Sequence, residues 1–238
     1  MKVVSDFIEQ ERSKFETQDN NLFAMTFGNI VRYLSFLEII FGRYNEASKL
    51  AHRSFKNLIE NSKADKKQTQ IAINYLLEVQ RRDSELLHLE IETFYLFAKI
   101  LLDKIARAME LYFGKARKAS LDSHDDLTKN IARFVETKKT KKLPEKLFEL
   151  AVWLKRNVCD YRDKQITHEK SPRTIKGTVF GSEEEDTRII TTRIYPTDHD
   201  KQIESLELNK VYEQIKVYLK LTIDFIVENR AYTGLKRI

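Results

Sequence analysis

An arginine and a histidine lie six residues apart at the end of an apolar stretch of this chain, at Arg162 and His168. An arginine always carries a positive charge and can bind a phosphate group through two parallel hydrogen bonds. A histidine titrates near neutral pH and can therefore transfer a proton during a reaction. Such a pair suits attack of a ribose 2′-hydroxyl on its own phosphate. His168 would be the acid or base, and Arg162 would stabilise the extra negative charge.

The segment that carries this pair is expected to be a helix that begins at Pro144, because proline is favoured at the first helical position. On an ideal helix, one arc of about 100° holds the apolar residues Leu147, Leu150, Ala151, Leu154, Val158 and Tyr161. Relative to Leu154, Arg162 lies at about +80° and His168 at about −40°. Both therefore border the packing face. They would converge if the helix unwinds near Thr167, or if a second subunit supplies another pair.

A structural role for the same pair stays open, with Arg162 in a salt bridge to a neighbouring helix and His168 capping a turn. The spacing is also short enough to recur by chance, since Arg82-Asp83-Ser84-Glu85-Leu86-Leu87-His88 has the same form. With Val79 taken as zero, His88 falls at about 180° and points away from the packing face of its helix. We interpret the earlier copy as coincidence and the later one as the candidate site.

The order of arginine, polar residue, four further residues and histidine near the end of a core helix resembles the signature of the HEPN superfamily. Its members are helical bundles that typically dimerise; many are metal-independent ribonucleases, and others bind RNA or nucleotides without cleavage. The resemblance covers mainly residues 144–168. It implies that Arg162, Asp163 and His168 form the catalytic site, with two copies facing each other across a homodimer. It also implies a setting in bacterial defence or a toxin–antitoxin pair, with an antitoxin or another protein as partner.

A cluster of lysines precedes this helix, at Lys138, Lys139, Lys141 and Lys142. The whole chain carries a net charge of +6 and has an isoelectric point near 9.1. This charge permits contact with RNA, DNA or an anionic membrane but does not require it. The lysine cluster is either a solvated loop or a surface that binds the phosphates of RNA.

Other kinds of chemistry find no support in the sequence. The single cysteine, Cys159, excludes a disulfide framework and a cysteine-based zinc site, and it is expected to be buried. A di-iron bundle needs two Glu-x-x-His motifs, whereas the chain holds one, at residues 85–88. A glycine-rich phosphate loop is missing. We therefore expect no metal and no cofactor. The isolated histidines are expected at the surface or in helix caps, and these are His52, His124 and His199.

Few helix breakers predict long helices, since the 238 residues include only 6 glycines and 3 prolines. Hydrophobic periodicity predicts helices at about 3–15, 21–60, 66–113, 123–137, 144–168 and 203–229. The stretch 94–103 is apolar nearly all round and is expected at the centre of the bundle, with Lys99 and Asp103 paired across one turn. Trp153 is expected in the core. Threonine, isoleucine, valine and aromatic residues on both sides of an acidic turn predict a β-hairpin at about 173–195.

These patterns predict one all-α domain over residues 1–238, a helical bundle with long antiparallel helices and a small β-hairpin insertion. The start of the chain lacks the apolar segment of a signal peptide, and no run of about 18 uncharged residues could span a bilayer. We therefore expect a cytoplasmic protein without membrane contact. The leading hypothesis is endoribonuclease activity. The alternatives are a non-catalytic module that binds RNA or a nucleotide, and a scaffold that binds another protein through its apolar helices.

Overall fold

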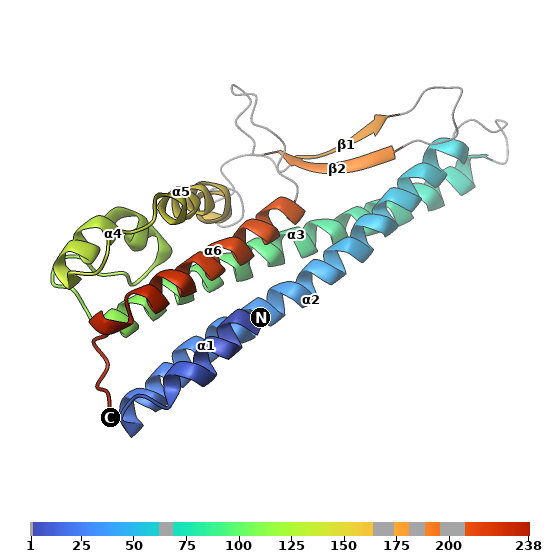
Figure 1. Cartoon of the computed structure of the whole chain (residues 1–238). Coiled ribbons are helices and arrows are strands. Elements are labelled where there is room, and N and C mark those ends of the chain that lie inside the picture. Colours follow the sequence, from blue (N-terminus) through green and yellow to red (C-terminus); the bar gives the residue numbers. More distant parts are fainter. Residues whose placement is uncertain (1, 62–68, 164–173, 181–188, 196–207) are drawn as a thin grey trace.

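Six α-helices build most of the described part of the chain, which comprises residues 2–61, 69–163, 174–180, 189–195 and 208–238 of the computed structural model (Figure 1). Each helix lies where hydrophobic periodicity predicted one, which confirms the α-helical fold class. The helices are α1 (Lys2–Arg12), α2 (Thr17–Asn61), α3 (Thr69–Phe113), α4 (His124–Lys138), α5 (Glu145–Leu154) and α6 (Leu208–Glu228).

The helices α2 and α3 form a long antiparallel pair that organises the whole molecule (Figure 1). Each has 45 residues, so each is roughly 67 Å long. Their contacts confirm the antiparallel direction, because the ring of Phe23 lies 6.3 Å from Tyr112 while Phe36 lies 5.8 Å from Phe97. Aromatic and aliphatic side chains at helical spacing fill the seam between the two helices.

Helices α1 and α6 cover one face of this pair and lie in front of it in Figure 1, while α4 and α5 lie above. From α1, Phe7 packs against Phe27 at 5.3 Å, and from α6, Tyr212 stacks on Phe41 at 4.7 Å. The centre of α3 is buried as predicted, since Ala98 and Leu101 are fully inaccessible to solvent.

The expectation that the centre of α3 is enclosed on every side was wrong. Leu96, Phe97 and Ile100 are only half-buried. The ring of Phe97 packs against Tyr33 and Phe36 of α2 at 6.1 and 5.8 Å. The centre of α3 is therefore only partly enclosed by the described helices.

The C-terminal segment closes one end of the bundle. The N–H of Gly234 donates to the carbonyl of Tyr112 at 2.8 Å, and Phe15 and Arg237 form an isolated β-bridge. Beneath this segment, the fully buried carboxylate of Glu11 pairs with Lys14 at 2.6 Å and with Arg230 at 3.3 Å. The sequence pattern gave no signal for this arrangement, because its partners come from opposite ends of the chain.

Replacement of Gly234 by alanine is expected to destabilise the protein by about 1–3 kcal/mol. A β-carbon at this position would lie 2.9 Å from both the Gly114 nitrogen and the Phe113 oxygen, so the C-terminal segment would have to move away from α3. Thermal unfolding of Gly234→Ala beside the exposed control Lys236→Ala measures the effect. Equal melting temperatures for the two variants would show that the segment tolerates the extra atom.

A two-stranded antiparallel hairpin connects the helix of the candidate site to α6. Its strands are β1 (Thr174–Phe180) and β2 (Ile189–Tyr195), which pair from Thr174 opposite Tyr195 to Phe180 opposite Ile189. They lie in the region where the sequence pattern placed a hairpin. Figure 1 shows the hairpin beside the half of the helix pair in which α2 ends and α3 begins, and β2 contacts α2. The acidic turn at 181–186 lies outside the described residues.

The helix α2 is long and apolar enough, by composition alone, to cross a membrane. An 18-residue stretch within Thr17–Leu58 has a mean hydropathy of 1.3 and at most two charged residues. The expectation that no stretch could span a bilayer considered only uncharged runs and missed this one. One third of the stretch is buried inside the protein, and Phe23, Phe27 and Leu34 are among the buried residues of α2.

Candidate functional site

The helix α5 carries the start of the candidate site and packs as predicted. Pro144 is the N-cap rather than the first helical residue, and its carbonyl accepts hydrogen bonds from the N–H groups of Leu147 and Phe148 at 3.0 and 3.2 Å. The predicted packing stripe is confirmed, because Leu147, Leu150, Ala151 and Leu154 are all buried. This stripe faces α6 and fixes the direction in which the helix runs toward Arg162.

Directly after α5 the chain forms a turn of π-helix, Lys155–Cys159, so the prediction of one regular α-helix to His168 was wrong. The N–H of Asp160 bonds to the carbonyl of Lys155, five residues earlier. Such a turn takes in one extra residue, which rotates later side chains by about 100° relative to an ideal helix. Cys159 thereby reaches the packing face, where it is 2% exposed, and Arg162 turns toward the same side.

Side chains from two elements support this wide turn. The amide of Asn157 donates to the carbonyl of Trp153 at 2.8 Å, and the ring Nε2 of His124 lies 3.0 Å from the carbonyl of Ala151. Side chains that bond to helix carbonyls are a known cause of local helix distortion. Lys155 forms an ion pair with Asp125 of α4 at 2.7 Å. Together these contacts fasten the π-turn to the N-terminal end of α4.

His124 is the largest departure from the expected positions of the histidines. It is completely buried rather than at the surface, and its Nδ1 lies 3.5 Å from the hydroxyl of Tyr218. Its backbone N–H donates to Asp103 at 2.8 Å. Burial lowers the pKa of His124 to about 4, so the ring is neutral at pH 7. A neutral ring can donate from Nε2 to Ala151 while Nδ1 accepts from Tyr218.

Arg162 lies at the end of the π-turn with its side chain about one-third exposed (33%). Its Nη1 donates to the carboxylate of Asp163 at 2.6 Å. Its Nε is buried and has no hydrogen-bond partner among the described residues. A buried donor without a partner is costly. The guanidinium is thus held by one acidic neighbour and keeps donor capacity for an anionic ligand.

Cys159 and Tyr161, which precede Arg162 in the chain, do not transfer protons at neutral pH. Burial raises the pKa of the Cys159 thiol to about 12 and that of Tyr161 to about 12. The ring of Tyr161 packs 4.4 Å from that of Tyr95. The predicted pair of Lys99 and Asp103 is confirmed, at 2.6 Å and 2.7 Å between Nζ and the two carboxylate oxygens. Cys159 and Tyr161 therefore supply neither a thiolate nor a phenolate at neutral pH.

His168 lies outside the described residues, as does Thr167. The structure therefore places Arg162 and Asp163 together but leaves the distance from Arg162 to His168 as a prediction. The earlier copy of the motif offers no comparable site. Arg82 is 78% exposed beside Asp83, and His88 is half-buried with an interaction partner of its own.

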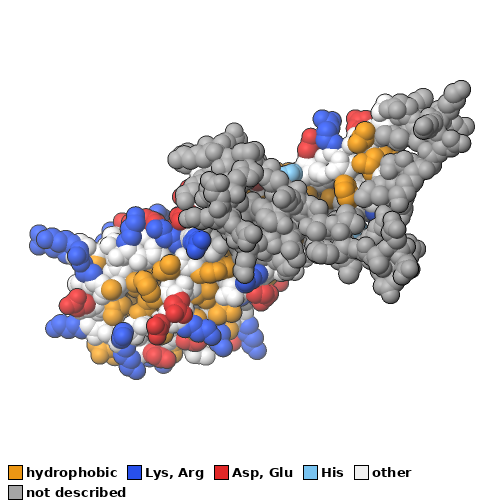
Figure 2. Space-filling model, turned by 90° about the horizontal axis from the view of Figure 1, so that it is seen from above, with side chains coloured by type: hydrophobic (Ala, Val, Ile, Leu, Met, Phe, Trp, Pro, Cys, Tyr) orange, Lys and Arg blue, Asp and Glu red, His pale blue; other side chains and the backbone are white. Residues whose placement is uncertain are grey.

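The lysine cluster lies at the other end of α5 from Arg162. Lys139, Lys141 and Lys142 are exposed, whereas Lys138 donates to the carbonyl of Lys115 at 2.8 Å. Roughly 25 Å of helix separates the cluster from Arg162. Figure 2 shows basic and acidic side chains intermingled over the described surface at the α4–α5 end. The cluster is thus a separate contact point rather than part of one continuous basic face.

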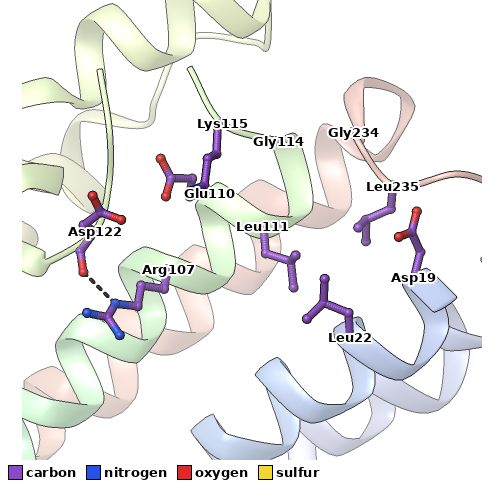
Figure 3. A pocket seen from close by; sticks show the side chains of 10 residues that line it. All are labelled: Asp19, Leu22, Arg107, Glu110, Leu111, Gly114, Lys115, Asp122, Gly234 and Leu235. Atoms are coloured by element: carbon purple, nitrogen blue, oxygen red, sulfur yellow. Dashed lines mark hydrogen bonds between the residues drawn. The ribbon is translucent and has the colours of Figure 1, made fainter. Parts of the chain in front are cut away.

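A pocket of about 480 Å³ opens where α3 meets the C-terminal segment (Figure 3). Leu22, Leu111 and Leu235 point into it together, and the charged side chains of Arg107 and Glu110 stand beside them. It lies near the C-terminal end of α3, whereas Tyr161, which precedes Arg162, contacts Tyr95 in the middle of that helix. This pocket could not be predicted from local sequence patterns, because its lining residues come from separate segments of the chain.

Cys159 is buried as predicted, and Trp153 is half-buried against the core rather than enclosed by it. His52 is half-buried, and His199 lies outside the described residues. Within the residues that the structure describes, no group of three or more histidine, cysteine, aspartate or glutamate side chains could hold a metal ion.

Comparison with protein-family models, with curated proteins and with solved structures finds no match to this chain.

Proposed function

We propose that this chain is a HEPN-like protein that acts on RNA as a metal-independent endoribonuclease, with Arg162, Asp163 and His168 in its site. The observation that carries the proposal is the setting of Arg162, whose buried Nε is unpartnered within the described residues at the end of a π-turn. π-turns within α-helices occur frequently at functional sites. The resemblance of the motif adds the assignment of His168.

In the proposed reaction, His168 transfers a proton and Arg162 stabilises negative charge on the phosphate. The ribose O2′ attacks the adjacent phosphorus, the bond from phosphorus to O5′ breaks, and the products carry a 2′,3′-cyclic phosphate and a 5′-hydroxyl. His168 moves the proton that the 2′-hydroxyl loses or the leaving O5′ gains. Arg162 donates hydrogen bonds to the phosphate oxygens as negative charge builds on them. Asp163 holds Nη1 of Arg162, so the phosphate would accept hydrogen bonds from the remaining donors of the guanidinium.

The same proposal includes a cytoplasmic homodimer in which a second subunit completes the site. A spacing of six residues places Arg162 and His168 about 120° apart on one ideal helix. Arg162 and Asp163 are themselves π-helical, and His168 lies outside the described residues, so this separation stays a prediction. A second copy of the motif would supply the missing partner across the interface. An antitoxin or other protein partner would control access to it in a defence setting.

An RNA oligonucleotide with one 2′-deoxyribose tests the reaction itself. With EDTA present, the protein is expected to cleave the all-ribose strand, and a deoxyribose at the main cleavage position should abolish that cut alone. The fragment ends should carry cyclic phosphate by mass spectrometry. Cleavage that persists at the deoxyribose position would contradict attack by the 2′-hydroxyl.

Non-catalytic RNA binding is the second candidate, and the exposed lysine cluster favours it. Replacing Lys139, Lys141 and Lys142 together by alanine is expected to lower RNA affinity and to reduce the slope of log affinity against log salt by about 2, at ~0.7 per phosphate contact on a single strand. All three side chains are exposed, so the melting temperature should not change. Fluorescence anisotropy from 50 to 200 mM salt measures the slope.

An unchanged slope would mean that the lysine cluster is a solvated loop and does not contact RNA. If the triple variant binds weakly but the wild type never cleaves any RNA, the binding-module alternative replaces the nuclease proposal.

A further inference from the structure

The pocket at the C-terminal end of α3 combines an apolar wall with charged side chains (Figure 3). Its volume of about 480 Å³ lies within the range of sites that hold small molecules, roughly 300–1,000 Å³. Leu22 of α2, Leu111 of α3 and Leu235 of the C-terminal segment form the apolar wall. Leu22 is 40% exposed, so an aliphatic ligand would cover apolar surface that the chain itself leaves open to solvent.

Glu110 places a buried carboxylate at this pocket, because the residue lines it and is only 5% exposed. Its Oε1 accepts hydrogen bonds from the Ser120 hydroxyl at 3.1 Å and from the Leu121 N–H at 3.2 Å. Within the described residues, no cation forms an ion pair with Glu110 and no donor bonds to its Oε2. Buried carboxylates are ordinarily paired, because an isolated buried charge is costly. Oε2 therefore remains an acceptor for a positively charged group in the pocket.

Arg107 supplies a positive charge on the same face of α3, one turn before Glu110. Its Nε donates to the carbonyl oxygen of Asp122 at 2.7 Å, which is the hydrogen bond drawn in Figure 3. This bond fixes the guanidinium and leaves its two terminal amino groups without hydrogen bonds to the described residues. Two parallel N–H groups of an arginine match the two oxygens of a carboxylate.

The charges around the pocket favour a ligand that carries both signs. Three carboxylates and two cations line it, namely Asp19, Glu110 and Asp122 with Arg107 and Lys115. A simple anion would meet this excess of negative charge, and a simple amine would leave the terminal amino groups of Arg107 without an acceptor. A zwitterion pairs with both Glu110 and Arg107.

We propose that this pocket binds a free α-amino acid with an aliphatic side chain, such as leucine. Its ammonium group pairs with Glu110, its carboxylate bonds to Arg107, and its side chain contacts the three leucines of the apolar wall. Residues three apart on a helix have β-carbons roughly 5–6 Å apart, which suits two charged groups that share one carbon of the ligand. The proposal does not rest on the nuclease assignment, because no residue of that site lines the pocket.

The glycines of the chain give a direct measure of binding. Of its 6 glycines, Gly114 and Gly234 line the pocket. In protein labelled with ¹⁵N at glycine, titration with L-leucine to about 10 mM should shift the NMR signals of these two residues. Gly42 is the internal control, since it lies 20 residues along α2 from Leu22, roughly 30 Å away, and its signal should not move. If the signals of Gly114 and Gly234 do not shift either, the proposal is wrong.

Two analogues of leucine separate the contributions of its charges. The amine 3-methylbutylamine lacks the carboxylate, and 4-methylpentanoate lacks the ammonium group, while both keep the aliphatic part. Each is expected to bind at least about tenfold more weakly than leucine, because one charged hydrogen-bond partner is lost. Binding of the amine as tight as that of leucine would overturn the role of Arg107, and equally tight binding of the acid would overturn that of Glu110.

The substitution Glu110→Gln tests the ammonium site with little change in shape. Glutamine keeps an oxygen that can accept from Ser120 and Leu121 but carries no charge, so affinity for leucine should fall by about tenfold or more. Arg117→Ala is the control, since Arg117 is an exposed cation of the loop after α3 that does not line the pocket. It should bind leucine like the wild type, and circular dichroism should show that both variants are folded.

Two exposed positions keep the test decisive if Glu110→Gln folds poorly. Arg107 is exposed and Leu22 is 40% exposed, so Arg107→Gln and Leu22→Ser should both fold. Arg107→Gln should lose the carboxylate contact and Leu22→Ser part of the apolar wall, and each should weaken leucine binding by about tenfold. Affinity equal to that of the wild type in both variants would overturn the proposal, whether or not the protein cleaves RNA.

Discussion

Replacing Arg162 by alanine is expected to lower the rate of RNA cleavage at saturating RNA by about 100- to 1000-fold, the usual effect of removing one donor that stabilises transition-state charge. The side chain is one-third exposed, and it forms an ion pair with the neighbouring Asp163. Its removal therefore leaves no buried charge unpaired inside the core, and the melting temperature should fall only slightly. Initial rates on a defined RNA with EDTA present give the comparison.

Two further variants separate a charge effect from a geometric one. Arg162→Lys keeps the positive charge but loses the planar fork that binds a phosphate through two hydrogen bonds, so it should remain strongly impaired. Arg156→Ala removes an exposed arginine of the same π-turn and should cleave like the wild type. Equal losses in Arg156→Ala and Arg162→Ala would point to non-specific electrostatics rather than to a site at Arg162.

Acid is expected to destabilise this protein through His124. Its pKa falls from 6.5 to about 4 in the folded chain because burial disfavours the charged ring. The neutral ring therefore contributes stability that is complete above pH 6.5 and is lost as the pH falls toward 4. The loss between pH 7 and pH 4 amounts to about 3 kcal/mol. Urea unfolding at a series of pH values measures this slope.

The substitution His124→Phe supplies the control for that slope. Phenylalanine keeps an aromatic ring at the site but does not titrate, so the variant should lose about 3 kcal/mol less than the wild type over the same pH range. At pH 7 it should itself be destabilised by about 1–3 kcal/mol, because the Tyr218 hydroxyl loses its acceptor. If the free energy of unfolding falls equally with pH in both proteins, groups other than His124 cause the acid sensitivity.

Most of the helical architecture could be predicted from local pattern. Periodicity located α2 and α3, and the single-turn spacing of Lys99 and Asp103 predicted their ion pair, because these features depend on neighbours within one helix. Leu96 and Ile100 were predicted to lie in the interior, because the sequence of one helix does not reveal how many other helices pack around it. The stretch of α2 that is apolar enough to cross a membrane escaped notice for a related reason, because isolated charges interrupt it.

The candidate site was harder to predict, for reasons that lie in long-range contacts. Nothing in the residue types of Lys155–Cys159 signals a π-turn, which depends on the bonds of His124 and Asn157 to carbonyls of α5. The burial of His124 likewise depends on α5 and α6, far along the chain. The motif singled out Arg162, whose Nε is buried and has no partner among the described residues, and its role in a site stays a prediction.

The most direct test of the central claim compares the wild type with the double variant Arg162→Ala/His168→Ala on mixed cellular RNA with EDTA present. Melting curves of both proteins would establish that both are folded. We expect cleavage by the wild type and none by the variant, at similar melting temperatures. Cleavage by both proteins, or by neither while the variant melts far lower, would contradict a catalytic site at Arg162 and His168 and leave the pair with a structural role.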